Sequence, residues 1–203
     1  MGTSAAMVQL KVVLAGGGGA ISDADCATIF ACFDPPIRMG PHEDMGSTRE
    51  WQAEHVPPCS NMHVKGRDGP RIDGCTNYDT DKAMTWIVED GQSLDTEHQR
   101  LTKAMREFSQ ANEASKKNAT LKEWMDQYEP EAKKVLEDRK VTDDAKELDK
   151  SALSAAAAKC IRQKVDASYQ GKVAQSTPLR NGQAQGLPPK KPMRGGSGSA
   201  GGF

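Results

Sequence analysis

The sequence predicts an α+β fold, with a small β-hairpin and irregular segments in the first half and helices in the second half. Three observations support this prediction. Glycine, proline and aspartate are frequent in the first half, where they interrupt regular structure. The stretch 83–88 combines β-branched and aromatic residues, as strands do, and ends in turn-forming residues. From about residue 95 to 170, apolar residues recur at helical spacing.

The composition limits what this chain can do. Its 203 residues suit one domain with tails. Only 36% of the residues are hydrophobic and 5% are aromatic, and the mean hydropathy is −0.67, so we expect part of the length to remain unpacked. The net charge of −1 provides no overall positive field. Binding to nucleic acid therefore has to depend on local positive charge and on a metal ion.

The sequence contains no membrane-crossing pattern. No apolar run approaches the ~20 residues that cross a bilayer, so we predict no membrane span. The apolar stretch 8–15 contains Lys11 and is followed by four glycines, which is not the layout of a secretory signal. We expect export to follow a route that needs no signal peptide.

The chain changes character along its length, and we divide it into three segments. Residues 1–50 are an irregular Gly/Pro-rich N-terminal segment with a strand-like run at 8–14. Residues 51–170 are the α+β domain that carries the candidate catalytic site, with a helical extension. Residues 171–203 are predicted to be a disordered basic tail, because they hold basic but no acidic residues and end in Gly and Ser. The basic residues of this tail are Lys172, Arg180, Lys190, Lys191 and Arg194.

Three helices are predicted in the second half from start signals and apolar stripes. Asp95 is the predicted N-cap of the first, and Thr120 with Glu123 forms a capping box before the second. Pro130 predicts a kink or a fresh start in the second helix. Thr142 is the predicted cap of a long Ala-rich third helix. The expected inward-facing residues are Leu101, Ala104, Met105 and Phe108; Leu121, Trp124, Met125, Tyr128, Ala132, Val135 and Leu136; and Leu148, Ala152, Ala156 and Cys160.

The cysteines favour buried free thiols. There are five, at positions 26, 32, 59, 75 and 160, and none forms a CxxC pair. This odd number argues against a disulfide scaffold or a four-cysteine zinc site. Three alternatives stay open. They are a bridge between Cys59 and Cys75 or between Cys26 and Cys32, a structural zinc at Cys59, His63 and Cys75, and a cysteine hydrolase that uses Cys59 or Cys75.

The residues suited to chemistry gather in the first half. All four histidines lie there, at positions 42, 55, 63 and 98, among acidic and amide side chains. The most suggestive order is Ala53-Glu54-His55-Val56-Pro57-Pro58, then Asn77, then the strand 83–88, then Glu97-His98 on a helix. This order resembles the HNH or ββα-metal (His-Me finger) nucleases, in particular the nuclease domains of polymorphic bacterial toxins of the type VI effector kind. The resemblance covers about residues 50–110 and implies a ββα-metal-like core.

The resemblance implies a role for each residue. Cutting a phosphodiester needs a base to deprotonate water and a cation to neutralise charge on the phosphate. His55 would be the general base and Asn77 would orient it through a hydrogen bond. Glu54 and His98 would hold a divalent ion, Mg²⁺ in the first place, with Zn²⁺, Mn²⁺ or Ni²⁺ as alternatives. Other candidates for these positions are Asn61 in place of Asn77, His63 in place of His98, and His42.

One geometric condition decides whether such a site forms. Adjacent strand residues point to opposite faces, so Glu54 and His55 serve one site only if the chain bends there, and Pro57-Pro58 could supply the bend. His98 precedes Leu101 by three residues, so it shares the inward-facing stripe of its helix. If that stripe packs on the hairpin, the two histidines converge.

We therefore expect a metal-dependent DNase that acts as an antibacterial effector. Such a toxin implies DNA as substrate, delivery into a target cell and a cognate immunity protein that inhibits it in the producer. The runner-up is a non-enzymatic module whose helices at 95–170 dock a partner, and it predicts exposed apolar area on those helices and histidines that lie apart. A third alternative is another toxin hydrolase, such as an RNase or a cell-wall hydrolase.

Overall fold

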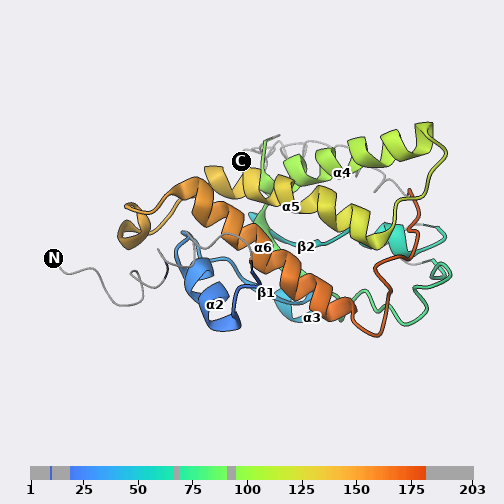
Figure 1. Ribbon diagram of the computed structural model, residues 1–203, viewed down its shortest axis with the longest axis horizontal. Coiled ribbons are helices and arrows are strands. Elements are labelled where there is room, and N and C mark those ends of the chain that lie inside the picture. The colour runs from blue at the N-terminus through green and yellow to red at the C-terminus, as the bar shows by residue number, and fades with distance from the viewer. Residues whose placement is uncertain (1–9, 11–18, 66–68, 91–94, 182–203) are drawn as a thin grey trace, which may run out of the picture.

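The computed structural model describes residues 10, 19–65, 69–90 and 95–181 and has the predicted α+β architecture. A three-stranded antiparallel sheet occupies the first half, and long helices occupy the second half (Figure 1). The strands are β1 (Met39–Pro41), β2 (Trp51–His55) and β3 (Met84–Glu89). The helices are α2 (Asp23–Ala31), α3 (His42–Met45), α4 (Glu97–Ala114), α5 (Leu121–Asp138) and α6 (Lys150–Tyr169), with short 3₁₀ turns at Cys59–Met62 and Asp143–Ala145.

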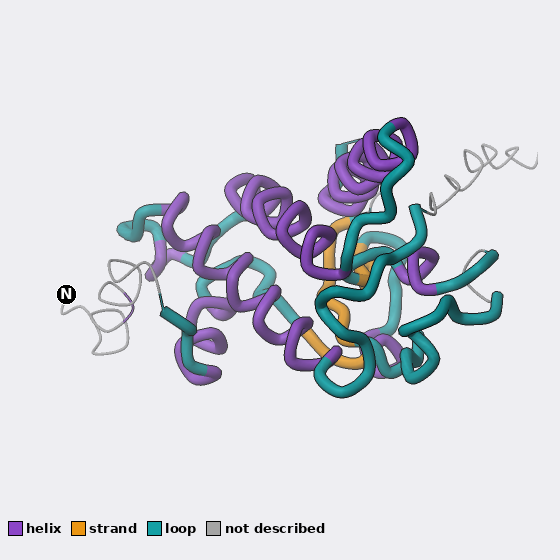
Figure 2. Tube along the Cα trace, turned by 45° about the vertical axis from the view of Figure 1, so that its right-hand side comes forward, coloured by secondary structure: helices purple, strands orange, loops and turns teal. Residues whose placement is uncertain are grey.

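The sheet separates a large core from a small one. Its order is β1-β3-β2, so β3 is central, and Figure 2 shows the strands gathered together beside the helices. Trp86 and Val88 of β3 are fully buried in the large core, against which α4 and α6 pack. Ile87 points the other way, into a small cluster with Ala53 and Met45 that the short α3 covers. This alternation follows from the two-residue period of a strand.

The start signals of α4 and α5 act almost as predicted. Thr96 rather than Asp95 caps α4, and its side chain accepts a hydrogen bond from the Gln99 amide. The capping box at Thr120 is confirmed, and the apolar stripe of α5 is buried. Pro130 neither restarts the helix nor ends it, because α5 runs unbroken from Leu121 to Asp138. The prediction of a fresh start at Pro130 is therefore wrong.

The third helix begins later than predicted. Thr142 precedes only a short 3₁₀ turn, and α6 starts at Lys150 behind Asp149, whose side chain accepts from the Ala152 amide. Ala152 itself is half-buried, whereas Leu153 and Cys160 are fully buried. Asp149 is thus the N-cap of this helix, and the sequence alone did not distinguish it from the other acidic residues after Thr142.

The N-terminal segment 1–50 is not wholly irregular, since it contributes α2 to the large core. A disulfide joins Cys26 of α2 to Cys160 of α6, which are 134 residues apart. The cysteine count did not predict this bridge. The other three thiols, at Cys32, Cys59 and Cys75, are free and buried as predicted, so neither of the two alternative bridges forms. The strand-like run 8–14 lies outside the described residues, except that Leu10 is helical and buried.

The first part of the predicted tail is packed rather than disordered. Val173 and Leu179 are buried, and the Leu179 amide donates to the Ala119 carbonyl at 2.9 Å. The chain was expected to be disordered from 171, but it is held in place as far as residue 181, because these two apolar side chains reach the core. Residues 182–203 lie outside the described part. Among the described helices, none is both long and apolar enough to cross a membrane.

Candidate active site

The unit β2–β3–α4 brings a carboxylate and an imidazole together. β2 and β3 pair in antiparallel register, with Glu54 opposite Trp86, and α4 packs on β3. Glu54 points to the helix-covered face, because its cross-strand partner Trp86 lies in the large core. His98 is the second residue of α4, and its Nδ1 lies 2.7 Å from Oε2 of Glu54. The two residues, 44 positions apart in sequence, form what we call the dyad.

The dyad is buried at its carboxylate end and accessible at its imidazole end. The Glu54 side chain is 7% exposed, whereas that of His98 is 20% exposed. Nδ1–H of His98 donates to the carboxylate, so Nε2 is the nitrogen that can accept a proton. Nε2 lies 3.4 Å from the side-chain nitrogen of Gln52, which is two residues before Glu54 on the same face of β2. A carboxylate that holds an imidazole in one tautomer is a recurring arrangement in general-base catalysis.

The dyad also sets the protonation behaviour of His98. Burial disfavours the imidazolium, but the hydrogen bond and the negative charge of Glu54 favour it more strongly. The negative charge of Asp90 also favours the imidazolium. Together they raise the pKa of His98 above its ordinary value of 6.5. A base whose pKa moves toward neutral pH combines availability with proton affinity.

His55 does not join the dyad, so the expected four-residue centre is not formed. β2 keeps a regular ladder through His55, which pairs with Thr85, and the strand ends only after it. No bend therefore brings Glu54 and His55 to one face, and the two side chains point to opposite faces. On its face, His55 has Nε2 3.1 Å from the Thr80 carbonyl oxygen, and its ring lies 4.5 Å from that of His42, centroid to centroid, with the planes tilted by 34°.

Asn77 is exposed in a turn of the long loop between β2 and β3. Its role as the residue that orients His55 stays a prediction. The competing candidates, Asn61 and His63, are buried elsewhere. Asn61 donates to the Arg180 carbonyl at 2.8 Å, and Nδ1 of His63 lies 2.8 Å from the Cys59 carbonyl oxygen. The contact of His63 lies within the loop, and that of Asn61 joins the loop to the C-terminal segment. Neither of these two contacts involves the dyad.

The donors of the dyad fit a divalent ion only in part. Nδ1 of His98 carries the hydrogen of its bond to Glu54 and has no lone pair for a metal, so the Glu54 carboxylate is the donor that the dyad offers to an ion. The described residues contain no group of three or more His, Cys, Asp or Glu side chains arranged to hold a metal. Mg²⁺ commonly takes one or two carboxylates and completes its shell with water and substrate phosphate oxygens. The dyad fits that mode of binding.

Cysteine chemistry finds less support. Cys75 is fully buried, and burial raises the pKa of its thiol to about 11, which leaves almost no thiolate at neutral pH. Its Sγ instead contacts the sulfur of Met62 at 3.4 Å. Cys75 is therefore a packing residue and a poor nucleophile.

Two residues beside the dyad were missed by sequence analysis. Gln52 could have been found, since the strand period places it on the face of Glu54. Arg139, which pairs with Glu97 next to His98, carried no signal, because it follows the end of α5 and lies 42 residues from its partner.

Comparison with protein-family models, with curated proteins and with solved structures finds no match to this chain. The geometry of the dyad and the resemblance at residues 50–110 are therefore the features that point to a function.

Proposed function

We propose that this protein is a metal-dependent nuclease that hydrolyses DNA phosphodiesters, with the Glu54–His98 dyad as its reactive centre. The observation that carries the proposal is a buried carboxylate 2.7 Å from an imidazole, in a strand–strand–helix unit. The order of these three elements, and the positions of Glu54 and His98 within them, agree with the resemblance to ββα-metal nucleases.

In this proposal His98, rather than His55, is the general base. Its Nε2 accepts a proton from the attacking water, and Glu54 fixes the tautomer and stabilises the imidazolium that forms. His55 lies on the opposite face of β2 from Glu54, and its Nε2 is 3.1 Å from the Thr80 carbonyl oxygen. The general base proposed here is thus a residue of α4, whereas the sequence analysis assigned that role to a residue of β2.

Glu54 would also provide the protein ligand for a divalent ion, Mg²⁺ by preference, with substrate phosphate oxygens and water completing the shell. When bound, such an ion would neutralise charge on the phosphate. The chain's own contribution is the buried carboxylate and the imidazole that it orients.

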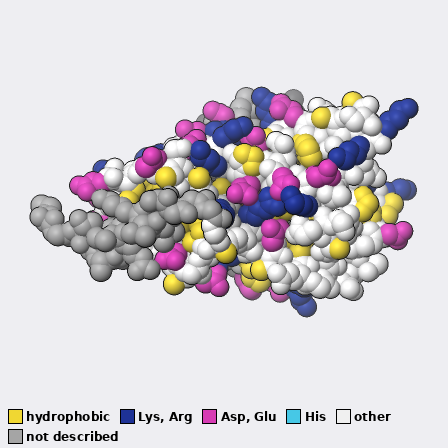
Figure 3. Space-filling view, viewed as in Figure 1, with side chains coloured by type: hydrophobic (Ala, Val, Ile, Leu, Met, Phe, Trp, Pro, Cys, Tyr) yellow, Lys and Arg dark blue, Asp and Glu magenta, His cyan; other side chains and the backbone are white. Residues whose placement is uncertain are grey.

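The surface argues against the alternative of a helical docking module. Val64 is the one large hydrophobic side chain exposed in the described part of the chain, and it lies outside the helices. Figure 3 shows acidic and basic side chains intermixed on one face, with hydrophobic ones scattered between them. A partner-binding helix pair of the kind considered above would expose a continuous apolar patch.

The disulfide supports export as part of the proposal. Bridges such as Cys26–Cys160 form and persist in oxidising compartments and are rare in a reducing cytosol. An exported nuclease that attacks other cells requires an immunity protein in the cell that makes it. We propose such an inhibitor as the protein partner.

Plasmid cleavage by the purified protein, with Mg²⁺ and with EDTA, tests the proposal. We expect cleavage that EDTA abolishes and that His98→Gln lowers by about 10²- to 10⁴-fold, the usual contribution of a general base. Cleavage that persists in His98→Gln and is lost in His55→Gln would show that His55 of β2 is the general base. A folded protein that cuts neither DNA nor RNA with Mg²⁺, Mn²⁺, Zn²⁺ or Ni²⁺ would overturn the nuclease.

A further inference from the structure

A buried ion pair lies directly beside the dyad. Glu97 begins α4 and precedes His98, and Arg139 follows the end of α5. Arg139 Nε donates to Glu97 at 2.7 Å, and its Nη2 donates to the second carboxylate oxygen. The two side chains are only 4% and 8% exposed. Both charges are thus removed from water, which is costly unless every donor and acceptor is satisfied.

The other contacts of Glu97 and Arg139 are with residues of β2 and β3. The Glu97 carboxylate also accepts from the Glu89 amide at 2.9 Å, and Arg139 Nη2 donates to the Ile87 carbonyl at 3.0 Å. The guanidinium lies 5.5 Å from the ring centre of Trp51 and 5.6 Å from that of Trp86. Trp86 is the cross-strand partner of Glu54. One guanidinium therefore contacts β2, β3 and the first turn of α4.

These contacts fix the rotation of α4 against the sheet. Consecutive helix residues are separated by about 100° around the axis. Once the Glu97 carboxylate is tied to the end of β3, the direction of the His98 side chain is set. Stability alone does not explain the pair, because well-packed apolar residues in place of a buried ion pair are often equally or more stable.

We propose that the Glu97–Arg139 pair is a positioning element that holds His98 against the Glu54 carboxylate. The inference rests on the proposed role of the dyad as the reactive centre. Its effect reaches the reaction only through His98, since neither member of the pair contacts the imidazole nitrogens.

The test is the pKa of His98, measured by NMR titration of the ring in folded protein. The double variant Glu97→Leu/Arg139→Met removes both charges without leaving either one alone. We expect the His98 pKa to fall toward 6.5 in this variant, because the contact with Glu54 loosens. DNA cleavage is expected to fall about tenfold to a hundredfold, as small misplacements of a base do. An unchanged pKa in the folded double variant would overturn the proposal.

A second variant covers a double variant that does not fold. Arg139→Lys keeps both charges but cannot donate to both Glu97 oxygens as the guanidinium does, and we expect a smaller fall of the His98 pKa. If Arg139→Lys leaves the pKa unchanged, the pair has a structural role alone.

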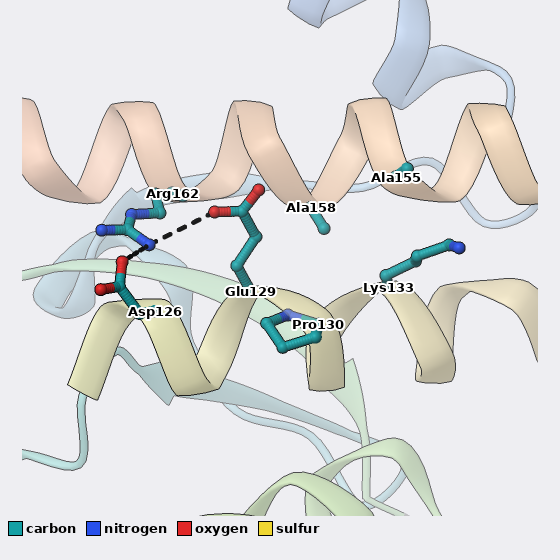
Figure 4. A pocket seen from close by; sticks show the side chains of 7 residues that line it. All are labelled: Asp126, Glu129, Pro130, Lys133, Ala155, Ala158 and Arg162. Carbon is teal, nitrogen blue, oxygen red and sulfur yellow. Dashed lines mark hydrogen bonds and ion pairs between the residues drawn. The ribbon is translucent and has the colours of Figure 1, made fainter. Parts of the chain in front are cut away.

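Arg162 offers a matched control. Figure 4 shows it reaching from α6 to Asp126 and Glu129 of α5, so it is also an arginine in a carboxylate network, and it is 16% exposed. Arg162→Met should lower stability without moving the His98 pKa.

Measurements on the wild-type protein distinguish the failure of the dyad from the failure of the positioning role. If its His98 pKa is not raised and Glu54→Gln does not change it, the dyad itself fails. If only the pair variants have no effect, the positioning role fails and the dyad stands.

Discussion

The two faces of the sheet carry similar residues in different settings. On the helix-covered face, Glu54 and His98 form an ion pair beside the large core. On the other face, His55 lies against His42, with the two rings tilted, on the side of the sheet where the short α3 packs on the small cluster. Both histidines follow an acidic residue directly in sequence, and the carboxylate that His98 contacts is that of Glu54, 44 residues away. The difference teaches that the acid which contacts a histidine need not be its neighbour in sequence, because packing of α4 on the sheet brings Glu54 to His98.

The largest expected contrast is in activity. Glu54→Gln should lower DNA cleavage at least a hundredfold at pH 7, because the amide cannot stabilise the imidazolium. His55→Gln, one residue along the same strand, should reduce cleavage less than tenfold. Initial rates on supercoiled plasmid measure both. Equal losses in the two variants would show that the faces act as one site.

A second contrast compares the same residue type in the two clusters. Trp86 is fully buried in the large core, whereas Trp51 is half-buried in the small one. Trp86→Ala should cost about 3–5 kcal/mol of unfolding free energy, the usual range for a core aromatic, and Trp51→Ala should cost less. Urea denaturation gives both values. A larger loss at Trp51 would mean that the small cluster contributes more than its burial indicates.

A third prediction concerns pH and stability. Because the pKa of His98 is raised in the folded protein, the dyad stabilises the fold fully below about pH 6.5, the ordinary pKa of an unfolded histidine. This contribution is lost as the pH rises through the raised pKa. One proton limits the slope to about 1.4 kcal/mol per pH unit. His98→Gln should remove this part of the pH dependence in denaturation measured from pH 6 to 8, and an unaltered profile would contradict the ion pair.

The smallest expected effect is at Asp90, the more distant carboxylate that acts on His98. Asp90→Asn should lower the His98 pKa in NMR titration, and by less than Glu54→Gln does, because Asp90 contributes through charge alone. A larger shift for Asp90→Asn than for Glu54→Gln would reverse the order of the two carboxylates.

Much of the fold was predictable because its signals are local. The strand near 83–88, the capping box at Thr120 and the buried stripe of α5 each depend on residues a few positions apart. Half of the site was predictable for the same reason. The inward stripe of α4 contains His98, and the strand period already required Glu54 and His55 to point apart unless the chain bent.

The sequence by itself thus determined the α+β class, the helix stripes and the rule that Glu54 and His55 face opposite ways. Only the tertiary structure decided which of them meets His98, which strand is central, and that Arg139 reaches Glu97. It also decided that Cys160 pairs with Cys26. The physical reason is range. Caps and periodicity involve neighbours in the chain, whereas the dyad, the ion pair and the disulfide join residues 44, 42 and 134 positions apart, and packing of the helices on the sheet brings these residues together.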